Sequence, residues 1–535
     1  MIEAFTMSKS KTKAKHKTVA KRKNASLQTN VKPEKTPSVH IPDWVRAVLI
    51  GVILLIGFLC FFCGRWYVNS FGRLGFDSVL YTLTGGLGGV QSGQVSGILM
   101  QGVLPSVLLT LLSVSLVLLI PAWIKADKPS STFPIRPVLY LCCVVLALGL
   151  ILFAAFDVEL VDYIIKQNSY SGLYESEYTD PEEVQIKFPE EKRNLIYIML
   201  ESMETSYLSK DLNGAMEENL IPELYDLAYE NLCFSNTDEK VGGFYTTKGA
   251  TWTIGSMVAQ TAGIPLKTPT EDVNQYGASG EAFLPGVTTL IDILDDAGYY
   301  QSLMVGSYAA FGGRKVYYEQ HGIDKIYDIY TARADGIIPK DYWVWWGMED
   351  LHLFEYAKQE LVKIAAQDQP FAFTMLTVDT HHVGGYQCEL CRPSTSGETY
   401  DQSISCSSRQ VAEFVAWIQQ QDFYENTSII IVGDHDSMDN GYFSRMVDED
   451  YQRLLYNCFI NCPVKASRVT NRLYTAHDLF PTTLAAIGCD IKGERLGLGT
   501  NLFSGKKTIA ERWGFEHYNE ELAKASSYYE ENFWG

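Results

Sequence analysis

The sequence is poor in basic residues for its length. Its 535 residues contain 44 Lys and Arg against 63 Asp and Glu, which gives a formal net charge of −19. This balance excludes a general nucleic-acid binder, because such proteins need positive charge to neutralise phosphates. Only 20% of the residues are charged and 47% are hydrophobic, so an intrinsically disordered chain is excluded too. No internal repeat is apparent, and the length suffices for two to four domains.

The basic residues that are present are concentrated at the beginning of the chain. Residues 1–156 contain 16 Lys and Arg and 5 Asp and Glu, so their net charge is +11, whereas that of residues 157–535 is −30. Residues 1–43 are polar and lack apolar periodicity, which is typical of a disordered basic tail. This split predicts a membrane-inserted front part followed by a soluble acidic body.

Three long hydrophobic runs follow the tail, over residues 44–63, 103–124 and 138–156. Each is about 20 residues long, enough to cross a hydrocarbon layer of ~30 Å. The first run has no small-residue cleavage site, which excludes a cleaved signal peptide. We therefore predict a membrane domain with three transmembrane helices over residues 44–156, and a loop or re-entrant turn in the Gly-rich residues 72–97.

The distribution of Lys and Arg predicts how the membrane domain is oriented. Ten basic residues precede the first run, and Lys125, Lys128 and Arg136 lie between the second and third runs. Only Arg65 and Arg73 follow the first run. The positive-inside rule places the N-terminus in the cytosol and everything after residue 156 outside, in an extracellular or periplasmic position.

From residue 194 onward, short apolar runs alternate with helical patterns. This alternation predicts an α/β fold with a doubly wound, mostly parallel sheet. We expect a linker over 157–190, a catalytic domain over 191–505 and a helical tail over 506–535. The expected strands are 194–200, 301–305, 371–378, 428–432 and 454–462, and the expected helices include 286–299 and 477–487.

Acidic and imidazole side chains follow three of these strands, where a doubly wound sheet binds its ligands. Glu201 follows the first, Asp379 and His381 follow the third, and Asp434 with His435 follows the fourth. Carboxylate and imidazole groups together suit a divalent ion such as Mn²⁺, Zn²⁺ or Mg²⁺. The alternative for any single carboxylate is that it caps the next helix.

A nucleophile candidate, Thr251, follows Gly249 and Ala250 at the start of a helical pattern. A helix N-terminus there would favour an alkoxide and a phosphate. The simpler alternative is that Thr251 is a helix cap.

Four segments occur in the order and spacing of the alkaline-phosphatase/sulfatase superfamily: LIYIMLESMETSY, GATWTIGSMVAQTAGIPL, TVDTHH and VGDHD. More narrowly, residues 190–505 resemble the membrane phosphoglycerol transferases, which comprise the lipoteichoic acid synthases and the enzymes that add phosphoglycerol to osmoregulated periplasmic glucans. The chain lacks the Cys- or Ser-x-Pro-x-Arg pattern of the sulfatase nucleophile, so sulfatase activity itself is not indicated.

This resemblance implies specific residue roles. It implies one divalent metal, Mn²⁺ before Zn²⁺ or Mg²⁺, held by Glu201, Thr251, Asp434 and His435. It makes Thr251 the catalytic nucleophile, and it assigns His381 and Arg314 to substrate binding.

The resemblance also implies a reaction. Phosphoglycerol would move from the donor lipid phosphatidylglycerol to a glycan or glycolipid acceptor through a phospho-threonine intermediate. The alternatives are a phosphoethanolamine transferase or a phosphodiesterase of the same superfamily, and a catalytically silent membrane sensor or scaffold.

Seven of the 11 cysteines lie outside the hydrophobic runs. A zinc cluster of Cys388, Cys391, Cys458 and Cys462 has permitted spacings. The predicted extracytoplasmic location favours disulfides over this zinc cluster. Because seven is an odd number, at least one of these thiols would stay unpaired.

The orientation can be tested by adding protease to intact protoplasts or spheroplasts. We expect the region after residue 156 to be digested while a cytosolic marker protein stays intact. Protection of that region until the membrane is lysed would mean that the orientation is reversed.

Overall fold

The computed structural model describes residues 42–84, 92–128, 134–267 and 282–534. Nearly all of the predicted basic tail (1–43) lies outside these residues. The chain divides into a small unit that ends at Arg46 and a compact unit over residues 47–535. The architecture described below belongs to the second unit.

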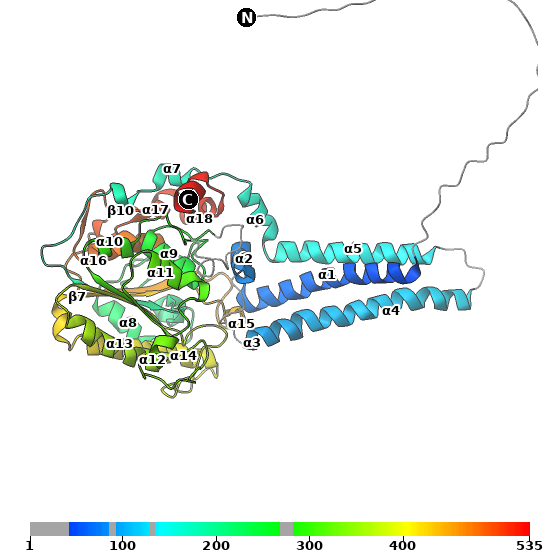
Figure 1. The fold of residues 1–535 in the computed structure, drawn as a ribbon, viewed down its shortest axis with the longest axis horizontal. Helices are drawn as coiled ribbons and strands as arrows, with labels where there is room; N and C mark the ends of the chain where they lie inside the picture. The colour runs from blue at the N-terminus through cyan, green and yellow to red at the C-terminus, as the bar shows by residue number, and fades with distance from the viewer. Residues whose placement is uncertain (1–41, 85–91, 129–133, 268–281, 535) are drawn as a thin grey trace, which may run out of the picture. The chain divides into compact units, whose positions relative to one another are not determined.

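Among the described residues, three helices are long and apolar enough to cross a membrane, in agreement with the predicted spans. They are α1 (Asp43–Phe71), α4 (Leu104–Asp127) and α5 (Ile135–Asp157), which lie side by side in Figure 1. The short helix α3 (Ser92–Gly97) and the π-helical turn η1 (Ile98–Val103) lead directly into α4. Gly57 allows α1 to pack closely on α5, because an added Cβ there would lie 2.9 Å from Ala147 Cα.

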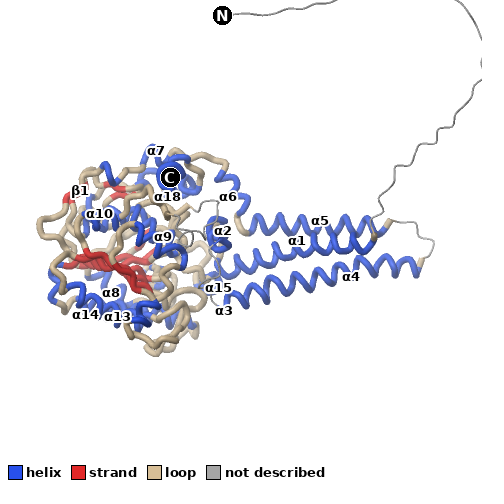
Figure 2. Tube along the Cα trace, viewed as in Figure 1, coloured by secondary structure: helices blue, strands red, loops and turns tan. Residues whose placement is uncertain are grey.

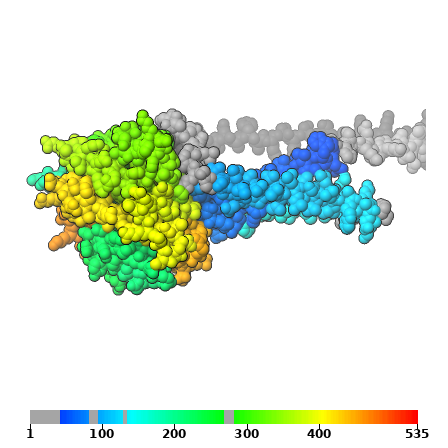
Figure 3. Space-filling model, turned by 90° about the horizontal axis from the view of Figure 1, so that it is seen from below, coloured from blue at the N-terminus to red at the C-terminus, as the bar shows by residue number. Residues whose placement is uncertain are grey.

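Charged and polar contacts hold the end of α1 against the rest of the chain. Asp157, buried at the end of α5, forms ion pairs with Arg65 (2.9 Å) and Arg73 (3.2 Å). Asn440, which begins α15 (Asn440–Met446), donates hydrogen bonds to the carbonyl oxygens of Val68 and Asn69. Figure 3 shows the corresponding blue and yellow surfaces in contact. Part of the predicted loop over 72–97 is instead helix α2 (Phe76–Thr84).

A mixed sheet of seven strands forms the centre of the following domain (Figure 2). The strand order is β3-β8-β7-β2-β6-β4-β5, in which β7, β2, β6, β4 and β5 are parallel and β8 and β3 are antiparallel additions. The strands are β2 (Asn194–Leu200), β3 (Gly243–Phe244), β4 (Tyr300–Val305), β5 (Lys325–Tyr327), β6 (Phe371–Leu376), β7 (Thr427–Gly433) and β8 (Leu455–Ile460).

Helices cover both faces of this sheet, as expected for strands that are apolar at nearly every position. Along β2, Leu195, Tyr197 and Met199 contribute to one core cluster, whereas Ile196 and Ile198 contribute to the other. The first face is covered by α9 (Thr253–Ala262), α10 (Leu290–Asp296), α11 (Arg314–Gln320) and α16 (Ala476–Ala486). The second is covered by α8 (Pro222–Glu230), α12 (Ile329–Ala334), α13 (Asp350–Ala365) and α14 (Thr399–Ile418). The predicted fold class is confirmed.

The regions expected to be linker and tail are folded onto the domain. Residues 157–190 contain α6 (Leu160–Gln167), α7 (Leu173–Glu177) and β1 (Ile186–Lys187). Residues 506–534 contain α17 (Ile509–Trp513), α18 (Phe515–Ala523) and α19 (Ser527–Tyr529). The side chains of Tyr174, Tyr529 and Phe533 are all buried in the first core cluster, so both regions contribute to it. The remaining strands form two short antiparallel pairs: β1 with β9 (Asp490–Ile491), and β10 (Arg495–Leu496) with β11 (Gly499–Thr500).

The end of β7 has no room for a side chain. An added Cβ at Gly433 would lie 2.1 Å from the carbonyl oxygen of Met203. We expect Gly433→Ala to lower the free energy of unfolding by about 1–3 kcal/mol, the usual cost of overpacking. At Gly172 an added Cβ would meet no atom within 4 Å, so Gly172→Ala should change it by less than ~0.5 kcal/mol. Thermal unfolding of the detergent-solubilised chain measures both, and equal midpoints would contradict the packing argument.

Candidate metal centre and substrate cavity

The candidate site begins where β2 and β7 end. These strands pair in parallel with Leu200 opposite Gly433, so Glu201 and Asp434 emerge at the same level of the sheet. The backbone N–H of Asp434 continues the pairing by donating to Leu200 O at 3.0 Å. Both carboxylates are buried, with exposed fractions of 2% for Glu201 and 0% for Asp434.

His435 completes a cluster of three candidate metal ligands with these carboxylates. Its Nε2 lies 3.3 Å from Asp434 Oδ2 and 3.6 Å from Glu201 Oε1. Its Nδ1 lies 2.9 Å from the carbonyl oxygen of Asp436, which identifies Nδ1 as the protonated nitrogen. Nε2 therefore presents a lone pair to the carboxylates, the arrangement that a metal-binding histidine requires.

The hydrogen bonds of the carboxylates leave room for a cation. Asp434 Oδ1 accepts from the backbone N–H groups of Ser202 and His435, both at 2.7 Å. Asp434 Oδ2 is buried and has no hydrogen-bond partner among the described residues. Glu201 Oε1 accepts from Ser202 Oγ at 2.7 Å. Two buried carboxylates in one place are unfavourable without a compensating positive charge, so this donor set fits a divalent ion.

The electrostatics of the cluster follow from burial and from the neighbouring charges. Burial, together with the negative charge of Glu201, raises the pKa of Asp434 to about 7. Burial alone would lower the pKa of His435, but the carboxylates of Asp434 and Glu201 raise it above its ordinary value. A bound divalent cation would favour the charged carboxylates and the neutral imidazole.

The hydroxyl that lies beside the cluster belongs to Thr253 rather than to Thr251. Helix α9 begins at Thr253, because Trp252 before it has extended backbone angles (φ −144°, ψ 160°). Thr253 Oγ1 lies 3.4 Å from His435 Nε2. The expected helix start at Thr251 is therefore wrong by two residues. The Thr251 hydroxyl is buried without a hydrogen-bond partner among the described residues.

A cavity of about 180 Å³ opens onto the cluster. Glu201, Thr253 and His435 line it, and so do the predicted substrate-binding residues His381 and Arg314. Thr251 is not part of its lining. Five of the six predicted site residues thus lie at this cavity or in the adjoining cluster.

Arg314 is held in place by several acceptors. Its Nη2 donates to Ser307 Oγ (3.0 Å) and to Tyr308 O (2.7 Å), and its Nε donates to Phe311 O (3.0 Å). Arg314, the first residue of α11, is buried, with an exposed fraction of 5%. These bonds fix the direction in which its positive charge faces the cavity.

The lining of the cavity also includes residues from the membrane part of the chain. Tyr67 and Phe71 of α1 contribute to it. The ring of Phe71 meets that of His382 edge-on at a centroid distance of 5.2 Å. The rings of His381 and Trp346 lie 4.4 Å apart. One cavity therefore joins the end of a candidate membrane span to the carboxylate–imidazole cluster.

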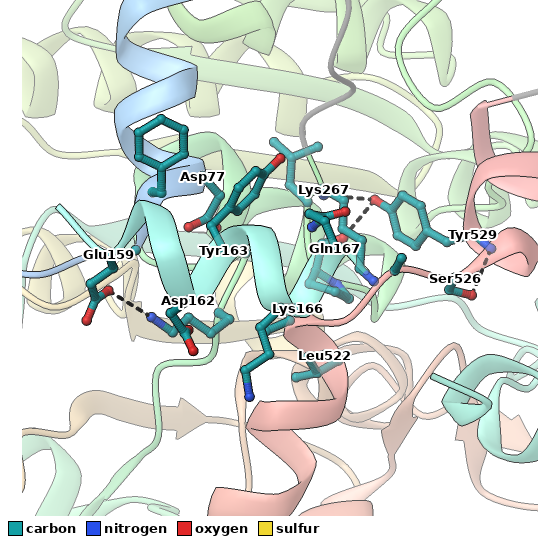
Figure 4. A pocket seen from close by; sticks show the side chains of 18 of the residues that line it. Asp77, Glu159, Asp162, Tyr163, Lys166, Gln167, Lys267, Leu522, Ser526 and Tyr529 are labelled. Carbon is teal, nitrogen blue, oxygen red and sulfur yellow. Dashed lines mark hydrogen bonds and ion pairs between the residues drawn. The ribbon is translucent and has the colours of Figure 1, made fainter. Parts of the chain in front are cut away.

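A larger cavity of about 360 Å³ lies elsewhere and is lined by none of the predicted site residues (Figure 4). Its charged lining is mixed, with Lys166, Lys248 and Lys267 beside Asp77, Glu159 and Asp162. Lys248 lies 3.6 Å from Glu159. Because the opposite charges offset one another, this cavity does not select an anionic group.

Sequence reasoning missed Thr253, His382 and Trp346. A signal for Thr253 was available, since the apolar spacing of Ile254, Met257 and Val258 places the first helical residue after Trp252. His382 adjoins the predicted His381 in the TVDTHH segment, but only the folded loops show that it and Trp346 reach the cavity.

The structure does not form the alternative cluster of four cysteine thiolates, and its described residues contain none of the favoured disulfides. Cys458 lies in β8, where its Sγ is 3.5 Å from Leu227 O. Cys388 instead adjoins Cys391 and Cys406, and the three sulfurs form a separate group. All eleven cysteines lie in the described residues, and each is a free thiol.

The fold and the carboxylate–imidazole cluster together define the class of this protein. It is a doubly wound α/β protein whose candidate metal ligands follow two neighbouring central strands. The match of residues 193–489 to the Sulfatase family model then identifies the family, and the chain belongs to it. The resemblance drawn from the motifs is thereby confirmed.

Its relatives include proteins named phosphoglycerol transferase I. That of Xanthomonas euvesicatoria pv. vesicatoria (strain 85-10) is 30% identical over 322 residues, which cover 58% of this chain and 43% of the relative. That of Citrobacter koseri is 29% identical over 440 residues, which cover 80% and 53%. The chain thus spans about half the length of the curated relatives it matches.

Two solved structures are similar at low sequence identity. Lipooligosaccharide phosphoethanolamine transferase A (EptA) from Neisseria meningitidis is 15% identical, with a TM-score of 0.47 over 84% of this chain and 85% of that one. The lipoteichoic acid synthase LtaP from Listeria monocytogenes is 17% identical, with a TM-score of 0.45 over 60% and 79%.

The cluster predicts how metal binding depends on charge and pH. We expect Asp434→Asn to weaken Mn²⁺ or Zn²⁺ binding by at least ~100-fold, since losing even a partner of a ligand typically costs ~10–100-fold. In the wild type, affinity should fall as pH falls below about 7, because protons compete for Asp434. Without metal, the stability of the fold should depend on pH in the opposite direction. Because the pKa of Asp434 is raised in the folded chain, this residue contributes stability at low pH, and that contribution is lost as pH rises through about 7.

Calorimetric titration of the full chain in detergent at several pH values measures these affinities. Asp436→Asn is the matched control, because Asp436 is the next carboxylate along the chain and accepts from Thr246 Oγ1 (3.0 Å) instead of facing the cluster. Equal losses of metal affinity in the two variants would contradict this ligand assignment.

Proposed function

We propose that the protein is a metal-dependent transferase that moves phosphoglycerol from phosphatidylglycerol to an extracytoplasmic glycan or glycolipid. The observation that carries this proposal is the cavity shared by the membrane helices and the cluster. Tyr67 and Phe71 of α1 line it together with Glu201, Thr253 and His435. A membrane phospholipid likewise combines an apolar body with an anionic headgroup.

The name phosphoglycerol transferase I, which the relatives bear, supports phosphoglycerol as the transferred group. The cavity supports a lipid donor, because a water-soluble ester would not need a wall from α1. The Lys and Arg distribution of the first 156 residues supports an acceptor outside the cytosol.

We assign the nucleophile to Thr253. As the first residue of α9, it lies where unpaired backbone N–H groups and the helix dipole favour negative charge. In the first step, Thr253 Oγ1 forms a bond to the lipid phosphorus, and the bond from phosphorus to the diacylglycerol oxygen breaks. Diacylglycerol leaves with a proton. In the second step, the oxygen of an acceptor hydroxyl forms a bond to phosphorus, and the bond from phosphorus to Thr253 Oγ1 breaks. The proton of the acceptor hydroxyl replaces the one that Thr253 lost.

The remaining residues bind and orient the headgroup. Arg314 supplies a fixed positive charge for the phosphate, and His381 also lines the cavity. Glu201, Asp434 and His435 would hold one divalent cation, for which Mn²⁺, Zn²⁺ and Mg²⁺ all suit the donor set. Such an ion supplies Lewis-acid stabilisation of the phosphate and of the attacking oxygen.

The covalent step can be tested by incubating the full chain with phosphatidylglycerol and Mn²⁺ and mapping modified peptides by mass spectrometry. We expect a phosphoglycerol adduct on Thr253. Thr253→Ala should abolish both the adduct and turnover, whereas Thr253→Ser should keep part of each because it retains a hydroxyl. The loss should be in kcat rather than in KM.

Thr251→Ala is the matched control, since Thr251 lies two residues away and does not line the cavity. It should retain turnover. An adduct on Thr251 would contradict the assignment of the nucleophile. A phosphoethanolamine adduct from mixed lipids would change the donor, and release of diacylglycerol without any adduct would exclude the covalent route.

A further inference from the structure

Three cysteine thiols lie close together, and none of them lines the cavity. Cys388 and Cys391 lie in the loop that follows β6, and Cys406 lies on α14. Cys388 Sγ is 3.8 Å from Cys391 Sγ and 3.7 Å from Cys406 Sγ. All three sulfurs lie within 4.8 Å of one another. Cys388 and Cys406 are buried, and Cys391 is partly exposed.

This spacing indicates what the group can bind. Two thiolates on one tetrahedral zinc ion, with Zn–S bonds of ~2.3 Å, lie about 3.8 Å apart. No iron atom of a 2Fe–2S or 4Fe–4S cluster binds three cysteines, so at least one of the three sulfurs would lie farther away. The three free thiols thus have the spacing of ligands to a single tetrahedral ion.

The thiols are held in this arrangement by bonds that do not involve sulfur. Ser403 Oγ, on α14, donates to Tyr386 O at 2.9 Å, and Gln387 Nε2 donates to Ser403 Oγ at 3.0 Å. Arg409, also on α14, donates to Leu390 O at 3.2 Å. The loop and the helix therefore keep their relative positions without a metal.

A donor that suits a thiolate is also present. Gln410 Nε2 lies 3.5 Å from Cys406 Sγ and 4.0 Å from Cys388 Sγ. Donors of this kind typically surround metal-bound ligands and stabilise their charge.

We propose that Cys388, Cys391 and Cys406 form a second metal site, which takes one thiolate-preferring ion of the zinc type. Soft sulfur ligands select such ions, in contrast to the oxygen-rich cluster of Glu201 and Asp434. Each thiol that binds releases its proton to solvent, and water fills the fourth position beside the partly exposed Cys391. The site would fasten the loop that follows His381 and His382 to α14. This proposal does not depend on the proposed transferase activity.

The test uses the full chain in detergent, kept reduced and free of chelators. A His435→Ala background disables the other cluster, so that the remaining metal can be counted. Metal analysis gives the zinc content. Titration with Co²⁺ then identifies sulfur ligands through sulfur-to-cobalt charge-transfer absorption in the near ultraviolet, which oxygen and nitrogen ligands do not produce.

We expect the His435→Ala chain to show this absorption and to retain one zinc. Cys391→Ser and Cys406→Ser should lose both signals, and Cys391→His should regain the zinc because imidazole is also a zinc ligand. Cys462→Ser is the matched control and should keep both, because Cys462 lies outside the group.

Three outcomes would overturn the proposal. One is a reduced His435→Ala chain without sulfur-to-cobalt absorption, which needs no cysteine variant and so does not depend on how the variants fold. Another is unchanged absorption in Cys391→Ser and Cys406→Ser. The third is a disulfide between two of the three thiols in protein isolated without reductant, detected by peptide mapping.

Discussion

The parallel pairing of β2 with β7 is the constraint on which the candidate site depends. Its register sets Leu200 opposite Gly433, so the next residue of each strand is a carboxylate and the two are buried side by side. Buried like charges repel one another, and the fold tolerates them because their oxygens face His435 and a position suited to a cation. A shift of one residue in this pairing would separate Glu201 from Asp434.

The loop after β7 depends on an ion pair whose carboxylate is buried. Glu204 is fully buried and accepts from Arg453 Nε at 2.8 Å and from the backbone N–H of Ser437 at 2.8 Å. Arg453 also donates to Ser437 O at 2.7 Å. Because Ser437 is two residues after His435, this network holds the turn that presents the imidazole. Loss of Arg453 would leave the buried Glu204 carboxylate without its charged partner.

Much of this arrangement could be predicted from the sequence, because it depends on local patterns. The buried strands are continuous apolar runs, and Glu201, Asp434 and His435 directly follow two of them. The antiparallel direction of β8 could not be predicted, since an apolar strand has the same composition in either direction. The same holds for the grouping of Cys406 with Cys388, which depends on how α14 packs against a distant loop. Thr253 was missed for a local reason, namely that Trp252 remains extended.

The part that α1 plays in the cavity has a consequence for the separated domain. Tyr67 and Phe71 belong to a segment that would conventionally be regarded as an anchor, yet they complete the wall of the chamber that holds the cluster. A soluble fragment that starts after α5 would keep its candidate metal ligands but would open that chamber to bulk water. Release from the membrane would thus change the surroundings of the cluster as well as the location of the protein.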